Sequence, residues 1–214
     1  TPIYNAFISG LLSGNWSDNL ESAGQASYAA NVVEALSVLQ EMQDMNIRPN
    51  VVTVSVVIDG LGRCNPPRCQ DAKDLVQHLE FTLRPKSSRI PGLTSRGISL
   101  SNRNIATALI RAYGRGNDVA SAIQSFERIA SPDVVAFNTL LDACCRSDKL
   151  KLALELFGEY VSFERWSGDR PVGSGNSGKD ITIKPDVVTY TTLISSLLQL
   201  KSKAATKRAS KMYT

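Results

Sequence analysis

The stretch that comes nearest to a nucleotide-binding motif is rich in glycine. Residues 173–179 (GSGNSGK) satisfy most of the pattern G-x-x-x-x-G-K, in which backbone amides and a lysine hold phosphates. Asp180 follows where the pattern needs a Ser or Thr hydroxyl for magnesium, and no buried strand precedes Gly173. A flexible glycine–serine insertion explains the segment better, so we expect no nucleotide site.

Histidine is too sparse for metal or nucleophilic chemistry. His78 is the only histidine, and residues 78–80 (HLE) match the H-x-E of zinc deaminases, but the required P-C-x-x-C is missing. A nucleophile would need a partner base, which a single surface histidine cannot readily supply. We therefore expect no enzyme, no metal and no cofactor.

The four cysteines indicate packing residues rather than a disulfide framework. Cys64 and Cys69 lack the C-x-x-C spacing of zinc ligands, and the adjacent Cys144 and Cys145 cannot bridge each other without severe strain. Apolar neighbours around the adjacent pair predict small buried thiols in a reducing compartment.

Composition sets broad limits on the class of protein. Hydrophobic residues make up 43% of the 214, enough for a packed core, and no uncharged apolar run is long enough to span a membrane. The chain starts without a methionine or a signal-peptide pattern, so we interpret it as a fragment. The net charge of +4 is compatible with nucleic acid. A basic stretch near the C-terminus fits phosphate contact and a solvated helix face equally well: Lys201, Lys203, Lys207, Arg208 and Lys211.

Internal repetition is the most informative feature of the chain. Three segments share Pro, then Asp or Asn, two valines and an apolar run: 48–59 (RPNVVTVSVVID), 131–142 (SPDVVAFNTLLD) and 184–195 (KPDVVTYTTLIS). Residues 1–12 and 103–115 are degenerate copies of the part after Pro-Asp. A second element recurs after the copies, with apolar residues three and four apart: 33–42, 120–129 and 152–160.

Both elements are predicted to be helices. The second has one apolar stripe, and the first opens with a proline and an Asp or Asn that supply a turn and an N-cap. β-propensity alone would make residues 51–58 a strand, but the repeat context favours a helix. Single hairpins cannot bury their apolar stripes, whereas stacked hairpins can. We therefore predict an all-α fold, an α-solenoid of stacked antiparallel helical hairpins.

The chain resembles the pentatricopeptide repeat (PPR) family. The family pattern V-V-T-Y-N-T-L-I-D, then A-L-x-L-F, closing on P-D, is matched by PDVVAFNTLLDACCR, LALELF and KPDVVTYTTLI. The tetratricopeptide repeat instead calls for W-x-x-L-G-x-x-Y. The resemblance implies one array over residues 1–214, with repeats at about 1–50, 51–102, 103–133, 134–186 and an incomplete 187–214. Three insertions lengthen the repeats, at residues 13–27, 84–96 and 166–184.

The resemblance also implies which residues recognise RNA. In this family, one base per repeat is recognised by the fifth residue and by the last residue before the next repeat. The implied pairs are Asn5 with Asn50, Ser55 with Asn102, Thr107 with Asp133, and Asn138 with Asp186, while Thr191 belongs to the incomplete repeat.

Hydrogen-bonding chemistry then predicts the bases. An ionised Asp only accepts hydrogen bonds and suits guanine or uracil, whereas Asn can donate and suits adenine or cytosine. Together with the family's use of Ser or Thr for purines and Asn for pyrimidines, this predicts 5′-pyrimidine-A-G-U-3′, parallel to the chain. Asn and Asp at these places also cap helices, and the sequence leaves both interpretations open.

Two further sets follow from the same alignment. Second-position residues Val52, Val135 and Val188 would sandwich bases, and Pro2 and Asn104 depart from that pattern. Cations at the thirteenth position would lie near phosphates: Arg63, Arg115 and Arg146. Isolated arginines are commonly solvated, but three at one repeat position are harder to explain by chance.

The implied function is recognition of single-stranded organellar RNA, in support of processing, stability or translation. The alternative is a structural scaffold that binds other proteins inside an organellar ribonucleoprotein such as a ribosome, and the insertions, the short repeat and the modest charge favour it somewhat. The family resemblance implies a mitochondrial or chloroplast location.

Overall fold

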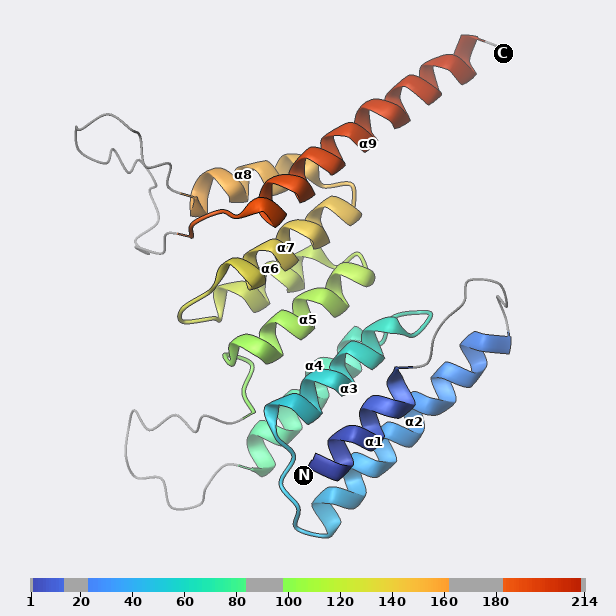
Figure 1. Cartoon of the computed structure of the whole chain (residues 1–214), viewed down its shortest axis with the longest axis vertical. Helices are drawn as coiled ribbons and strands as arrows, with labels where there is room; N and C mark the ends of the chain where they lie inside the picture. The colour runs from blue at the N-terminus through green and yellow to red at the C-terminus, as the bar shows by residue number, and fades with distance from the viewer. Residues whose placement is uncertain (1, 14–22, 84–97, 162–182, 213–214) are drawn as a thin grey trace, which may run out of the picture.

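The computed structural model describes residues 2–13, 23–83, 98–161 and 183–212, and within these ranges all regular structure is helical (Figure 1). The helices are α1 (Pro2–Leu12), α2 (Ala23–Asp44), α3 (Val51–Arg63), α4 (Cys69–Thr82), α5 (Arg103–Arg115), α6 (Val119–Glu127), α7 (Val134–Arg146), α8 (Leu150–Tyr160) and α9 (Val187–Met212).

Side-chain caps start the odd-numbered helices α3, α5, α7 and α9. Asn50 accepts a 2.9 Å hydrogen bond from the backbone N–H of Thr53 at the start of α3, and Asp133 accepts one of 2.9 Å from Ala136 at the start of α7. The valine-rich segment 51–58 is therefore helical, as the repetition predicted and against its β-propensity. The physical reason is burial, because Val54 and Val57 are fully covered in the core.

The helices form two layers (Figure 1). The odd-numbered helices α1, α3, α5, α7 and α9 pack side by side in chain order. Each even-numbered helix packs on the odd-numbered helices before and after it. This arrangement confirms the predicted all-α fold of stacked hairpins.

Small residues set the spacing of the odd-numbered layer. A Cβ added to Gly62 of α3 would lie 2.8 Å from the Cα of Ala112 in α5, and one added to Gly114 of α5 would lie 3.0 Å from the Cα of Ala143 in α7. In each case the twelfth residue of one repeat meets the tenth residue of the next. The same helix-to-helix register therefore recurs, and it aligns equivalent positions of neighbouring repeats.

An aromatic cluster joins the last two complete hairpins. Phe126 of α6 lies edge-on to Tyr160 at the end of α8, with ring centroids 5.3 Å apart, and Phe137 of α7 lies 6.0 Å from both. The backbone N–H of Ile183 donates a 2.9 Å hydrogen bond to the carbonyl of Tyr160. The residues that lead into α9 are thus joined to the end of α8.

One predicted boundary is wrong. The first insertion was placed at residues 13–27, but α2 begins at Ala23, so residues 23–27 are helical. The misplacement arises because this part of α2 has no apolar periodicity to mark it as a helix. Residues 14–22, all of 84–96 and 166–182 lie outside the described residues, and so does the glycine-rich segment 173–179. In the described part of the chain, no helix combines the length and the apolar character needed to cross a membrane.

Candidate nucleic-acid interface

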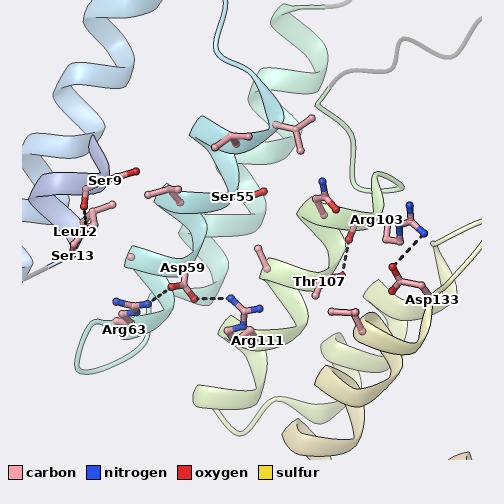
Figure 2. A pocket seen from close by; sticks show the side chains of 17 residues that line it. Ser9, Leu12, Ser13, Ser55, Asp59, Arg63, Arg103, Thr107, Arg111 and Asp133 are labelled. Atoms are coloured by element: carbon pink, nitrogen blue, oxygen red, sulfur yellow. Dashed lines mark hydrogen bonds and ion pairs between the residues drawn. The ribbon is translucent and has the colours of Figure 1, made fainter. Parts of the chain in front are cut away.

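A groove follows the exposed face of the odd-numbered layer. It consists of three adjoining pockets: one between α1, α3 and α5 of about 780 Å³, one between α5, α7 and α9, and one between α7 and α9. Arg111 and Val135 line both the first and the second pocket, and Asp142 and Arg146 line both the second and the third. We call this continuous surface the groove, and Figure 2 shows its first pocket.

Most of the predicted RNA-binding residues line the groove, though not all. Those that do are Ser55, Thr107, Asp133, Asn138, Asp186, Thr191, Val52, Val135, Val188, Arg63, Arg115 and Arg146. Asn5, Asn50 and Asn102 are not among its lining residues. The stacking of equivalent repeat positions therefore brings the fifth-position and last-position side chains together in the groove at two of the four junctions, Thr107 with Asp133 and Asn138 with Asp186.

The fifth and last positions form a hydrogen-bonded pair at the last junction. Asn138 donates through Nδ2 to Oδ1 of Asp186 over 2.9 Å. Thr189, the third residue of α9, donates its hydroxyl to Oδ1 of Asn138 over 2.6 Å, and its backbone N–H donates to Oδ1 of Asp186 over 2.9 Å.

These contacts act on the charge of Asp186. Hydrogen bonds to the ionised carboxylate from the backbone N–H of Thr189, from Asn138 and from the Thr189 hydroxyl hold the pKa of Asp186 below its ordinary value. The side chain is exposed, so an ionised acceptor is presented at the groove.

The first junction repeats the arrangement. Nδ2 of Asn5 lies 3.4 Å from Oδ1 of Asn50, and the Thr53 hydroxyl donates to Oδ1 of Asn5. Asn50 is also the N-cap of α3, so pairing with a fifth-position residue and helix capping are performed by one side chain. The two interpretations left open by the sequence are therefore compatible.

The two middle junctions lack such a pair. The hydroxyl of Ser55 is buried and has no hydrogen-bond partner, and Asn102 caps α5 by accepting from the N–H of Asn104 over 3.0 Å. The hydroxyl of Thr107 donates to the carbonyl of Arg103, at 2.8 Å, rather than to Asp133. Asp133 is held instead by Arg103, whose Nη1 lies 3.2 Å from its Oδ2 (Figure 2).

The three second-position valines present apolar surface. Val52, Val135 and Val188 are 55%, 59% and 56% exposed, and all three line the groove. Exposed β-branched side chains at the same position of three repeats provide apolar contacts that suit the faces of stacked bases. Asn104, which occupies the equivalent place in α5, also lines the first pocket but is polar.

All three predicted phosphate-contacting arginines are paired with carboxylates. Arg63 lies 2.6 Å from Asp59, Arg115 lies 2.9 Å from the same carboxylate, and Arg146 lies 2.7 Å from Asp142. Burial by itself would raise the pKa of Asp59, but the hydrogen bond and charge of Arg115, together with the other nearby guanidinium groups, hold it below its ordinary value.

Two groove arginines were not found from the sequence. Arg111 reaches Asp59 at 3.5 Å and lines two pockets, and Arg103 pairs with Asp133 (Figure 2). Asp59 thus has three arginines around it, which leaves a positive excess between α3 and α5. Arg111 holds the ninth repeat position, where α3 and α7 carry Asp59 and Asp142, so only a search for the charge reversal within the repeat could have identified it.

The remaining polar chemistry is sparse. His78 is exposed on α4, and no group of three or more His, Cys, Asp or Glu suited to a metal ion occurs in the part of the chain that is described. Cys64 and Cys144 are buried, Cys69 and Cys145 are partly buried, and none forms a disulfide. Burial raises the pKa of Cys144 to about 11, which makes it a poor nucleophile at neutral pH.

Comparison with known proteins agrees with the repeat architecture. A family model described as PPR repeat matches residues 128–159, which contain α7 and all of α8 except its last residue. A mitochondrial pentatricopeptide repeat-containing protein of Arabidopsis thaliana is 28% identical over 61% of this chain and 16% of its own length. Another such protein from the same plant is 26% identical over 74% of this chain and 18% of its own length.

A third relative is named as a ribosomal protein. The small ribosomal subunit protein mS78 of Arabidopsis thaliana is 32% identical over 48% of this chain and 23% of its own length. The chain therefore spans less than a quarter of the length of each of these relatives.

Proposed function

We propose that this chain, which belongs to the pentatricopeptide repeat family, binds single-stranded RNA along the groove and the first junction beside it, with about one base at each junction between repeats. The observation that carries the proposal is the pairing of Asn138 with Asp186 at the groove surface. The proposed role is binding in support of RNA processing, stability or translation, without catalysis by this stretch of chain.

The bonded pairs have defined hydrogen-bonding faces. Asn138 uses Oδ1 to accept from Thr189 and one amide hydrogen to contact Asp186, which leaves a second amide hydrogen for a ligand. Asp186 adds a carboxylate acceptor. Uracil offers the complement, a carbonyl acceptor beside the N3 proton, whereas cytosine presents an unprotonated N3 to the carboxylate. We therefore assign uracil to this junction.

The first junction has the opposite character. Oδ1 of Asn50 accepts from the N–H of Thr53, so its amide nitrogen faces outward as a donor. Asn5 likewise offers an amide hydrogen, because its Oδ1 accepts from the Thr53 hydroxyl. Two donors suit the acceptors O2 and N3 of cytosine. The run C-A-G-U is the proposed ligand, with adenine and guanine assigned to the middle junctions.

Apolar sandwiching and charge would supply the remaining affinity. Exposed valines in three repeats lie near the fifth-position and last-position residues. Three arginines surround the single carboxylate of Asp59, which leaves an excess of positive charge. Stacking contacts of this kind contribute to binding of single strands without regard to sequence, and cations add an affinity that falls with salt.

Location is carried over from the relatives. Some are named as mitochondrial and others as chloroplastic, and we propose an organellar location for the protein that contains this chain.

Fluorescence anisotropy with short labelled RNAs tests the proposal. Wild-type protein should bind a CAGU-containing strand more tightly than a scrambled strand, and CAGU about tenfold more tightly than CAGC. Asp186→Asn replaces the acceptor by a donor and should reverse the second preference. Equal binding of all strands, unchanged in Asp186→Asn, would contradict base recognition.

The alternative function is a protein scaffold in a ribonucleoprotein. The sequence similarity to a ribosomal subunit protein supports it, and so does a row of apolar side chains on α9, where Val187, Ile194 and Leu198 are 81%, 54% and 61% exposed. Leu141 of α7 holds the same repeat position as Ile194 and is fully buried, so Ile194 is exposed where the equivalent side chain is covered. Absence of RNA binding together with co-purification of organellar ribosomal proteins would favour the scaffold.

A further inference from the structure

The third residue of two odd-numbered helices contacts both members of a base-contacting pair. These residues are Thr53 in α3 and Thr189 in α9, and their exposed fractions are 1% and 0%. Neither belongs to the fifth-position or last-position sets. Burying a hydroxyl group costs free energy unless the group is hydrogen-bonded. The hydrogen-bond partners of each threonine therefore determine where its hydroxyl proton points.

The direction of each hydrogen bond follows from its partners. The Thr189 oxygen accepts from the backbone N–H of Asp186 over 3.1 Å, and the Thr53 oxygen accepts from the N–H of Asn50 over 3.2 Å. An N–H group can only donate, so each hydroxyl proton remains available for a side-chain acceptor. In α9 the shortest contact of that hydroxyl is with Oδ1 of Asn138, at 2.6 Å.

This hydrogen bond orients the fifth-position amide. With Oδ1 of Asn138 turned to Thr189, its nitrogen must face Asp186 and the groove, because the carboxylate can only accept. The same reasoning applies to Asn5, whose Oδ1 accepts from Thr53 and whose nitrogen faces Asn50. An asparagine without the threonine contact could turn its amide over and present an acceptor instead.

The other two junctions provide the contrast. Their third residues are Ile105 and Ala136, which carry no hydroxyl. At these junctions Ser55 has no hydrogen-bond partner for its hydroxyl and Thr107 donates to its own helix, so neither hydroxyl is hydrogen-bonded to the last-position residue.

From this contrast we infer that Thr53 and Thr189 are positioning residues for base recognition, and that discrimination is concentrated in the first and fourth bases of the bound run. The second and third bases, at junctions without a threonine, are bound with little discrimination. The inference rests on the proposed function and adds to it an uneven distribution of specificity along the chain.

Thr189→Val is the informative change, because it keeps the shape and removes the hydroxyl. We expect the preference for CAGU over CAGC to fall from about tenfold to within about twofold, while affinity for CAGU changes less. Thr189→Ser should restore the preference. Thr82→Val in α4 is the control outside the groove, since the exposed Thr82 hydroxyl donates to the carbonyl of His78, at 2.8 Å, and it should leave the preference intact.

A second variant guards against misfolding of the first. Thr53→Val should reduce discrimination at the first base, CAGU against AAGU, and leave the fourth base unaffected, with thermal unfolding showing that each variant is folded. Loss of affinity for every strand in equal measure would assign the threonines a purely structural role and overturn the inference.

The outcomes separate the two proposals. A wild-type preference at the fourth base that survives Thr189→Val would overturn the positioning role and leave RNA recognition standing. A wild type that does not distinguish any of the strands would overturn both.

Discussion

Asn138 of α7 and Asp186 before α9 are 48 residues apart in sequence and share a 2.9 Å hydrogen bond. The bond crosses the junction between two repeats, so it exists only when the helices are stacked. It connects a side chain buried between α7 and α9 with a carboxylate that is exposed at the groove.

This contact predicts a measurable titration. An NMR titration followed at the carboxyl carbon should give a pKa for Asp186 below the ordinary 3.8, and Asn138→Ala should raise this pKa. A lowered pKa favours the folded state above the unfolded pKa, so the stability difference between wild type and variant should be full above pH 3.8 and close as the pH falls through the folded pKa. Asn104→Ala, an exposed change in α5, is the control and should leave the titration unchanged.

Arg103 should limit base discrimination at the third junction. Its guanidinium occupies Oδ2 of Asp133 while Oδ1 caps α7, so both carboxylate oxygens are engaged. Arg103→Gln should increase the preference for G over A at the third base, by up to about fivefold if the pair has the usual strength of an exposed ion pair. Arg128→Gln removes a charge at the end of α6 and should not alter the ratio. An unchanged ratio in Arg103→Gln would show that Asp133 does not contact the base.

Arg111 should contribute to the salt dependence of binding. It lines two pockets of the groove and shares its aspartate with two closer arginines. In Arg111→Gln the slope of log K against log salt should become less negative by about 0.7, the value for one phosphate contact on a single strand. Lys151→Gln, at a position 94% exposed on α8, removes an equal charge outside the groove. Equal effects of the two changes would indicate only a general charge effect.

The close contact of α5 and α7 predicts that Gly→Ala changes at Gly114 and at Gly158 have opposite effects on the free energy of unfolding. Gly114→Ala places a methyl group 2.7 Å from the Cβ of Ala143 and should cost about 1–3 kcal/mol, measured by chemical unfolding. Gly158→Ala in α8 meets nothing within 4 Å and should stabilise the protein by about 0.5–1 kcal/mol through helix propensity. Similar effects at both positions would mean that the helices separate easily.

Cys144 should be protected from alkylation. Burial raises its pKa to about 11, so at pH 8 iodoacetamide should modify it only after unfolding, as judged by mass spectrometry. A raised thiol pKa favours the folded state below the unfolded value of 9.0, and that contribution is lost as the pH rises toward 11. Rapid labelling of Cys144 in the native protein would contradict its burial.

Much of the fold could be predicted because its signals are local. Apolar residues at helical spacing and Asp or Asn before a valine pair lie within a few residues of one another, and their repetition indicated stacked hairpins. The start of α2 was missed because residues 23–27 carry no apolar periodicity. Arg111 was missed because it reverses the charge common at its repeat position, and its contact with Asp59 comes from the neighbouring helix.

The helices, their caps and the positions at which polar side chains recur follow from the sequence, since these depend on residues close along the chain. Which of those side chains are hydrogen-bonded to one another depends on how the helices stack. Thr189 donates to Asn138 across 51 residues and Arg115 to Asp59 across 56, whereas the hydroxyl of Ser55 has no hydrogen-bond partner. The reason is that hydrogen bonds between repeats depend on the register of stacked helices, which is set by contacts such as Gly114 against Ala143.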